Sequence, residues 1–405
     1  MKYPITPDYL VNVPDSIIRL YSDLETVVLQ DICRRFKLSG EATESAIQQI
    51  QVLRSRGVDF SHIERYIQNT LRLSQEEYDE IFDRAVERNK GYYDKVIGKA
   101  DLVKFDTVSL WAELDAIRRQ TQEQLVNLTQ SLGFAVKTAR GIEFLPIAKT
   151  YQKILDDAEI QIWSGAFDYN TAIRNAVKRI TDSGLQTVDY STGWHNRVDV
   201  AARRAVMTGV SQLSAQYSEA AAEVLETDLR EVTAHQGARD TGTGRQNHKS
   251  WQGKVYSVKP GHPKYPDIHE VCGLGAVDGL EGVNCRHHHF PFVEGVSERT
   301  WTDEQLKSID PPPFEYQGRK YTAYEATQKQ RQIETAMRKC KRELIGYEES
   351  GQVEAYQDSA IRLQRLSEEY KKFSSAAGLR KQPERARVQG YGPGESARAR
   401  AAADK

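Results

Sequence analysis

The sequence predicts a mainly α-helical protein with one small α+β domain rich in cysteine and histidine, followed by a helical or coiled-coil segment and a disordered basic tail. Apolar residues recur every three or four positions through most of the first 230 residues. Seven of the nine histidines and two of the four cysteines lie between His235 and His289, where this period disappears. The helical period then returns from about residue 323. At 405 residues, the chain is long enough for two or three domains.

Residues 1–140 form the predicted N-terminal helical region. The stretches "DSIIRLYSDLETVVLQDICRRF", "SHIERYIQNTLRL" and "QEEYDEIFDRAVERNKGYYDKVIG" all carry the helical period. The "PDS" at residues 14–16 is a helix-start signal for the first stretch, and Ser61 and Ser74 are N-cap candidates for the next two. "TVSLWAELDAIRRQTQEQLVNLTQSLG" continues the pattern and ends at Gly133.

Residues 141–230 form a second helical region that ends in a long helix rich in small residues. In "NRVDVAARRAVMTGVSQLSAQYSEAAAEVLE" the apolar side chains fall broadly on one face: Val198, Ala201, Ala205, Val210, Leu213, Ala220 and Val224. Because many of these side chains are small, we expect another helix to approach this face closely.

Residues 231–310 form the predicted Cys/His-rich α+β domain. Glycine becomes frequent here, and "REVTAHQGA" and "GKVYSVK" are typical of short strands between loops rich in Gly, Pro, Asp and Asn.

The C-terminal part begins after three consecutive prolines in "SIDPPPFEYQGRKY" and is predicted to be helical over 323–373. Its apolar residues step by four, three, four and three, which is the spacing of a coiled-coil seam: Ile333, Met337, Cys340, Leu344 and Tyr347. Gly346 and the "SGQ" at 350–352 interrupt the run, so either one bent helix or a helical hairpin is expected.

Residues 374–405 lack a core pattern. From Arg380 onward seven Lys/Arg face three Asp/Glu, a net charge of +4, which predicts a disordered basic tail.

The chemistry of the Cys/His-rich domain centres on "NCRHHH". Cys285 and His287 are two residues apart, so on a strand both side chains would point to one face and His288 to the other. This pair could supply two zinc ligands, and Cys272 with His248 or His235 could complete a tetrahedron. The spacing is not that of a zinc finger.

Two other interpretations of the same residues stay open. The cysteines can be small buried apolar groups and the histidines hydrogen-bonded loop residues. In a hydrolase or nuclease, one histidine would be a general base and Arg239 or Arg286 would stabilise a phosphate. The sequence contains no H-E-x-x-H, G-x-S-x-G or P-loop motif, so no catalytic or cofactor-binding residue is predicted, and a structural zinc ion is the one candidate cofactor.

Composition and charge constrain the class of protein further. A mean hydropathy of -0.63 and a formal net charge of -1 describe a polar chain whose overall charge favours no particular partner. No segment approaches the length of apolar sequence that spans a membrane, and the first residues lack the basic-then-apolar pattern of a signal peptide. We therefore expect synthesis in the cytoplasm, where the default state of the four cysteines is the free thiol.

The order of several motifs resembles one known family. The chain contains H-x-G-A-R-D from His235, H-x-x-W-Q-G-K-V-Y-S from His248, C-G-L-G from Cys272, then G-L-x-G-x-N-C-R-H from Gly279 and P-F at 291–292. This order resembles the phage minor capsid protein 2 family, and more distantly the Mu F-like head morphogenesis proteins. The specific match covers roughly residues 231–300, and the run of histidines after Arg286 departs from the more mixed residues expected there.

The resemblance implies a structural role in the head of a tailed phage or prophage, acting with the portal protein and the capsid proteins during head assembly or DNA delivery. It places the protein in the virion, and in the host cytoplasm during assembly. The basic tail could contact packaged DNA. Two alternatives remain: a metal-dependent, nuclease-like enzyme housed in residues 231–300, and an assembly factor that is absent from the mature particle.

Overall fold

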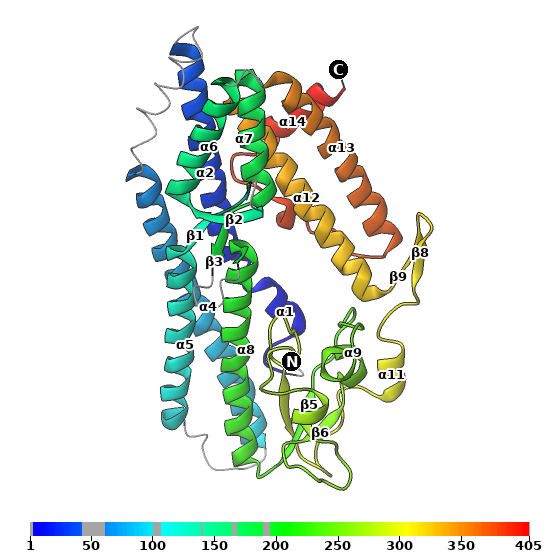
Figure 1. Cartoon of the computed structure of the whole chain (residues 1–405). Coiled ribbons are helices and arrows are strands. Elements are labelled where there is room, and N and C mark those ends of the chain that lie inside the picture. The colour runs from blue at the N-terminus through cyan, green and yellow to red at the C-terminus, as the bar shows by residue number, and fades with distance from the viewer. Residues whose placement is uncertain are drawn as a thin grey trace. The chain divides into compact units, whose positions relative to one another are not determined.

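The computed structural model describes residues 3–42, 61–99, 107–138, 141–163, 168–188 and 195–404. Helices dominate these residues (Figure 1), so the predicted fold class is confirmed. The long helices are α2 (Asp15–Ala42), α4 (Ser61–Lys99), α5 (Thr107–Gln130), α6 (Ile147–Trp163), α7 (Tyr169–Ser183), α8 (Val198–Val224), α12 (Ala323–Glu349), α13 (Val353–Ala376) and α14 (Pro393–Ala403). The shorter ones are α1 (Pro7–Asn12), η1 (Gly244–Gln246), α9 (His248–Trp251), α10 (Ile268–Val271), α11 (Asp303–Lys307) and η2 (Pro383–Ala386). Among the described residues, no helix is both long enough and apolar enough to cross a membrane.

The chain forms two compact units, each assembled from separate parts of the sequence. Unit 1 comprises Met1–Ile17, Ser74–Leu125 and Ala202–Gln328, and unit 2 comprises Ile18–Leu73, Val126–Ala201 and Lys329–Lys405. The whole Cys/His-rich segment lies in unit 1. The five-part division of the chain expected from the sequence stays a prediction.

In unit 1, helices pack closely on the small-residue face of α8. Gly209 of α8 faces Thr121 of α5 and Tyr78 of α4. A methyl group at Gly209 would lie 2.5 Å from the Thr121 Oγ1 and 2.6 Å from the Tyr78 Oη. Nearby, the Ser214 hydroxyl lies 3.0 Å from Asn89 Oδ1, in a fully buried hydrogen bond between α8 and α4. The absence of a side chain at Gly209 is therefore what permits this close approach.

A small sheet in unit 2 was not expected, because residues 1–140 and 141–230 were predicted to be mostly helical and no strand was predicted there. Antiparallel strands are arranged in the order β2-β1-β3-β4: β1 (Leu132–Thr138), β2 (Gly141–Pro146), β3 (Gln186–Val188) and β4 (His195–Arg197). The helical prediction is wrong for these segments. β3 and β4 are three residues long, too short for a period to show in the sequence, and tertiary pairing decides their conformation.

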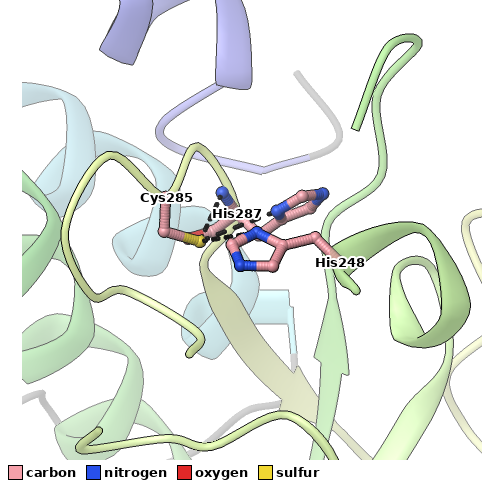
Figure 2. A group of neighbouring side chains, drawn as sticks. All are labelled: His248, Cys285 and His287. Atoms are coloured by element: carbon pink, nitrogen blue, oxygen red, sulfur yellow. Dashed lines mark hydrogen bonds between the residues drawn. The ribbon is translucent and has the colours of Figure 1, made fainter. Parts of the chain in front are cut away.

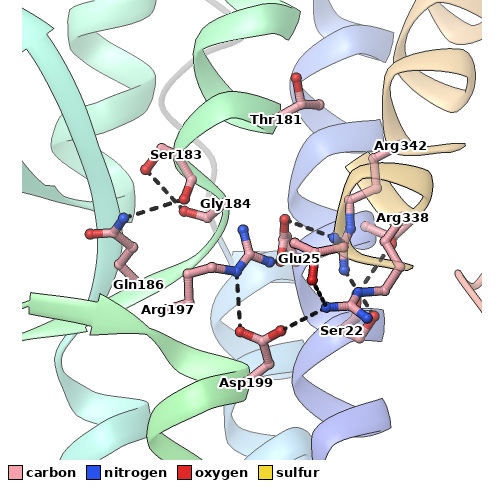
Figure 3. A network of polar contacts seen from close by, with 12 residues as sticks. Ser22, Glu25, Thr181, Ser183, Gly184, Gln186, Arg197, Asp199, Arg338 and Arg342 are labelled. Carbon is pink, nitrogen blue, oxygen red and sulfur yellow. Dashed lines mark hydrogen bonds and ion pairs between the residues drawn. The ribbon is translucent and has the colours of Figure 1, made fainter. Parts of the chain in front are cut away.

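Buried ion pairs hold several parts of unit 2 together (Figure 3). Glu25 of α2 lies 3.3 Å from Arg342 of α12 and 3.3 Å from Arg197 of β4. Asp199, at the start of α8, lies 3.2 Å from Arg197 and 3.5 Å from Arg338 of α12. Glu25, Arg197 and Arg342 are far apart in the sequence, so only the folded chain pairs them.

The C-terminal helical region of unit 2 is a hairpin of α12 and α13 (Figure 1), one of the two arrangements expected. Two side-chain hydrogen bonds link the helices. The Tyr370 hydroxyl donates to Glu334 at 3.0 Å, and the Ser359 hydroxyl donates to Glu343 at 3.1 Å. The turn is the expected "SGQ" at 350–352. Gly346 does not interrupt α12, contrary to the prediction, but lies against Val177 of α7 and Cys33 of α2. A coiled coil stays a prediction, although the seam residues named above are buried.

The basic tail differs from the prediction of disorder, because residues 393–403 form α14 and pack against α13. Pro393 stands in the first turn, and Glu395 accepts a hydrogen bond from the backbone N–H of Gly392 at 2.8 Å. Arg398 pairs with Glu348 of α12 at 2.9 Å. The start signals, the alanine-rich composition and this ion pair stabilise the helix, although the segment has no apolar period.

Candidate metal centre

The Cys/His-rich segment is built on a three-stranded antiparallel sheet in the order β6-β5-β7. β5 (Leu229–Val232) and β6 (Val255–Ser257) lie where short strands were expected, and β7 (His289–Phe292) follows the histidine run. One core cluster beside the sheet contains Val232, Trp251, Tyr256, Ile268, Cys272, Leu280 and Cys285. Loops supply much of this core, so its shape depends on contacts between distant segments.

Three predicted ligands converge at the edge of this core: His248, the first residue of α9, and Cys285 and His287, which precede β7 (Figure 2). The Cys285 Sγ lies 3.7 Å from the Nδ1 of His248 and 3.6 Å from the Nδ1 of His287. One ligand atom from each of the three lies within 4.8 Å of the others. The three side chains are buried, with exposed fractions of 4% for His248, 2% for Cys285 and 1% for His287.

Gln252, directly after α9, fixes the orientation of the His287 ring. Its Oε1 accepts a hydrogen bond from the backbone N–H of His235 at 3.0 Å, which identifies this atom as the oxygen. The same oxygen lies 3.1 Å from His287 Nε2, so Nε2 carries the hydrogen. The lone pair of His287 is therefore on Nδ1, which faces the sulfur of Cys285.

Burial keeps the imidazoles of the cluster neutral. It lowers the pKa of His248 to about 4, with Arg239 adding to the effect, and it lowers the pKa of His287 well below its usual value. Burial also raises the pKa of the Cys285 thiol to about 11. At neutral pH the histidines therefore have free lone pairs, and a bound cation would be needed to favour the thiolate.

The other two predicted ligands lie near the cluster but do not join it. The His235 ring stacks on that of His287 with centroids 4.5 Å apart, and its Nδ1 lies 2.8 Å from the carbonyl oxygen of Gln236. Cys272 is fully buried in the apolar core, in the same cluster as Tyr256. The structure thus brings together three of the five side chains.

The remaining histidines of the run have different surroundings. Neither ring nitrogen of His288 has a hydrogen-bond partner among the described residues, and its ring packs edge-on against Tyr3. His289 Nε2 lies 2.7 Å from a carboxylate oxygen of Glu219 on α8, and His289 Nδ1 lies 3.0 Å from Glu281. Burial disfavours the charged imidazole, but the two carboxylates outweigh it and raise the pKa of His289 to about 9.

The sequence interpretation did not identify the polar residues that position this cluster. Arg230 of β5 donates to both carboxylate oxygens of Glu219, at 3.1 Å and 2.7 Å, and Glu219 also contacts His289. These contacts fix the start of β7, two residues after His287. No spacing rule connects Glu219 or Gln252 with the histidines, so the sequence held no signal for either.

The chain is similar in sequence to known phage proteins. Residues 5–374 match the family described as phage minor capsid protein 2. A "Structural protein" of Lactococcus phage LL-H is 29% identical over 193 residues, 45% of this chain and 48% of that protein. A "Structural protein" of Lactococcus phage mv4 is 36% identical over 103 residues, 25% of this chain and 74% of that protein. The chain thus spans about half the length of the first relative, and no solved structure matches it. Since the family match extends over nearly the whole chain, the protein belongs to the phage minor capsid protein 2 family.

Proposed function

We propose that the protein is a minor structural component of a phage head that acts with the portal protein and the capsid proteins in head assembly or DNA delivery. The observation that carries the proposal is the family match over residues 5–374. The two relatives, each described as a structural protein of a phage, support a place in the virion. In this proposal the chain is present in the host cytoplasm during assembly and in the head afterwards.

The role we propose is structural and not enzymatic. A nuclease-like enzyme would need a cation and a phosphate-binding group that a substrate can reach. The three side chains of the cluster are almost fully buried, and the guanidinium of Arg286 donates to the carbonyl oxygen of Gly237 at 3.0 Å. Both observations favour an architectural role for the Cys/His-rich segment over hydrolysis.

Quantitative mass spectrometry of purified phage particles tests the proposal. We expect the chain in mature particles at a copy number well below that of the major capsid protein. A phage with a stop codon in this gene should yield particles that lack the chain and have altered portal or DNA content, and supplying the gene in trans should restore them. Presence in assembly intermediates but absence from mature particles would support a transient assembly factor and contradict the proposed place in the virion.

We also propose that the basic tail contacts packaged DNA. Arg398 is already paired with Glu348 and Glu395, so the exposed cations Arg380, Lys381 and Arg400 are the better candidates. Replacing these three with alanine should weaken binding to duplex DNA and flatten its salt dependence, because fewer counterions are released. Alanine at three exposed lysines elsewhere, Lys90, Lys320 and Lys371, is the matched control. Equal loss in both triple variants would contradict a role specific to the tail.

A further inference from the structure

We propose that His248, Cys285 and His287 bind one zinc ion, which stabilises the fold of the Cys/His-rich segment. The proposed role in the phage head does not require this site, and the two proposals can fail separately.

The distances match a tetrahedral zinc site. Zinc binds thiolate sulfur at about 2.3 Å and imidazole nitrogen at about 2.0–2.1 Å, so a tetrahedral angle places sulfur and nitrogen about 3.6 Å apart. The two distances from Cys285 Sγ to the histidine Nδ1 atoms are 3.7 Å and 3.6 Å. One ligand atom from each of the three side chains also lies within 4.8 Å of the others, so the three side chains are close enough to share one ion.

Hydrogen bonding without a metal satisfies the same atoms less well. A thiol has one hydrogen, so Cys285 can donate to only one of the two imidazole nitrogens. The other imidazole would have to donate its own hydrogen to sulfur, which is a weak acceptor. A zinc-bound thiolate leaves no such conflict, because both nitrogens then bind the ion.

Gln252 is the positioning residue for His287. Histidines that bind metals usually donate their second ring N–H to an oxygen acceptor, which fixes the tautomer and the ring orientation. His287 Nε2 meets this requirement through Gln252 Oε1, itself held by the backbone N–H of His235.

The ligand types favour zinc over calcium or magnesium, and the burial of the site favours a structural role. One thiolate and two imidazoles suit zinc, whereas calcium and magnesium require oxygen ligands. The site is buried beside a core in which loops supply many of the apolar side chains, where a metal can contribute directly to folding. The assignment covers three protein ligands, because His235 stacks parallel to His287 and Cys272 lies in the apolar core.

Metal analysis of the purified full-length chain tests the site. We expect about one zinc per chain, lost in Cys285→Ser and in His287→Ala. Cys272→Ser is the matched control, because Cys272 is as fully buried in the same core cluster and should be dispensable for zinc. His235→Ala should also retain the zinc. Wild-type protein that neither contains nor takes up zinc, or a Cys272→Ser variant that loses it as Cys285→Ser does, would overturn the proposal.

A second measurement does not depend on whether the variants fold. The wild-type chain loaded with cobalt(II) should show the intense visible bands of a tetrahedral ion and a sulfur-to-cobalt charge-transfer band. Only weak absorption of six-coordinate cobalt, with no sulfur band, would overturn the assignment of Cys285 as a ligand.

Discussion

His287 Nε2 and Gln252 Oε1 lie 3.1 Å apart, and this contact directs the other ring nitrogen of His287 toward the sulfur of Cys285. The two residues are 35 positions apart in the sequence of the Cys/His-rich segment. We therefore expect Gln252 to affect the zinc affinity of the site, although it does not bind the metal itself.

Gln252→Ala should weaken zinc binding by about 10- to 100-fold, because the His287 ring loses the acceptor that fixes its tautomer. Gln252→Glu keeps an acceptor for both contacts and should bind zinc within a few-fold of the wild type. Chelator competition measures the affinity, and Gln236→Ala, at an exposed neighbouring position, is the control. If Gln252→Glu binds zinc as weakly as Gln252→Ala, the hydrogen bond does not position the ligand.

Glu231 should make unit 1 less stable as pH rises toward neutrality. Burial raises its pKa to about 7, although its Oε1 accepts a hydrogen bond from the Thr300 N–H at 2.6 Å. The folded-state pKa of Glu231 exceeds its unfolded value, so the folded protein favours the protonated carboxyl group. The stabilisation by this proton is fully present below about pH 4.5 and is lost as pH rises through 7. Relative to Glu231→Gln, the free energy of unfolding of the wild type should fall by up to about 3 kcal/mol across that window.

Chemical denaturation at pH 5 and pH 7.5 checks this, with the exposed Glu298→Gln as the control for removing a carboxylate. A pH dependence that is the same in the wild type and in Glu231→Gln would refute the prediction.

Gly209→Ala and Gly91→Ala should change stability in opposite directions. The methyl group at Gly209 would overlap Thr121 and Tyr78, which should cost about 1–3 kcal/mol of unfolding free energy. Gly91 lies on α4, and apart from its own stretch of helix no atom of the described residues lies within 4 Å of an added methyl group. Alanine there should therefore stabilise the helix by up to about 1 kcal/mol. Thermal or denaturant unfolding of both variants measures the difference, and a loss of similar size in both would show that α8 does not pack as described.

Glu25→Ala should destabilise unit 2 strongly. Glu25 is 3% exposed and pairs with Arg197 and Arg342, so its removal leaves buried guanidinium groups without this carboxylate. The loss of one partner from a buried pair costs about 3–5 kcal/mol. Glu80→Ala is the matched control, because the Glu80–Arg84 pair lies at the surface and should contribute at most about 0.5 kcal/mol. Similar midpoints of denaturant unfolding for the two variants would contradict the proposed contribution of the Glu25 ion pairs to the free energy of unfolding.

Helices and strands with a clear local pattern could be predicted from the sequence. The periods in α4, α8, α12 and α13 and the strand composition of β5 and β6 correspond to elements found in the structure. Strands β3 and β4 were not predicted, because strands of three residues have no measurable period. Strands β1 and β2, with seven and six residues, lie in regions that were expected to be mostly helical. Helix α14 was not predicted, because residues 374–405 lack an apolar period and residues from Arg380 onward carry a net positive charge. The partner of Arg398 also lies fifty residues earlier, at Glu348.

The candidate metal centre, too, was predicted only in part from the sequence. The spacing of Cys285 and His287 suggested that both face one side of a strand, and the structure brings them together with His248. Cys272 was chosen because it is a cysteine in the same segment, but the fold places it in an apolar core beside Tyr256. Residue type identifies which side chains can bind a metal, but not which of them meet.

By itself the sequence determined the helical class, the position of the Cys/His-rich segment and the resemblance to a family of phage head proteins, because periodicity, composition and motif order are local properties of the chain. Only the tertiary structure decided that His248, Gln252, Cys285 and His287 share one site and that Glu25 is paired with arginines more than 170 positions away. Such contacts depend on how distant segments pack, and the sequence near each residue does not encode that arrangement in a readable pattern.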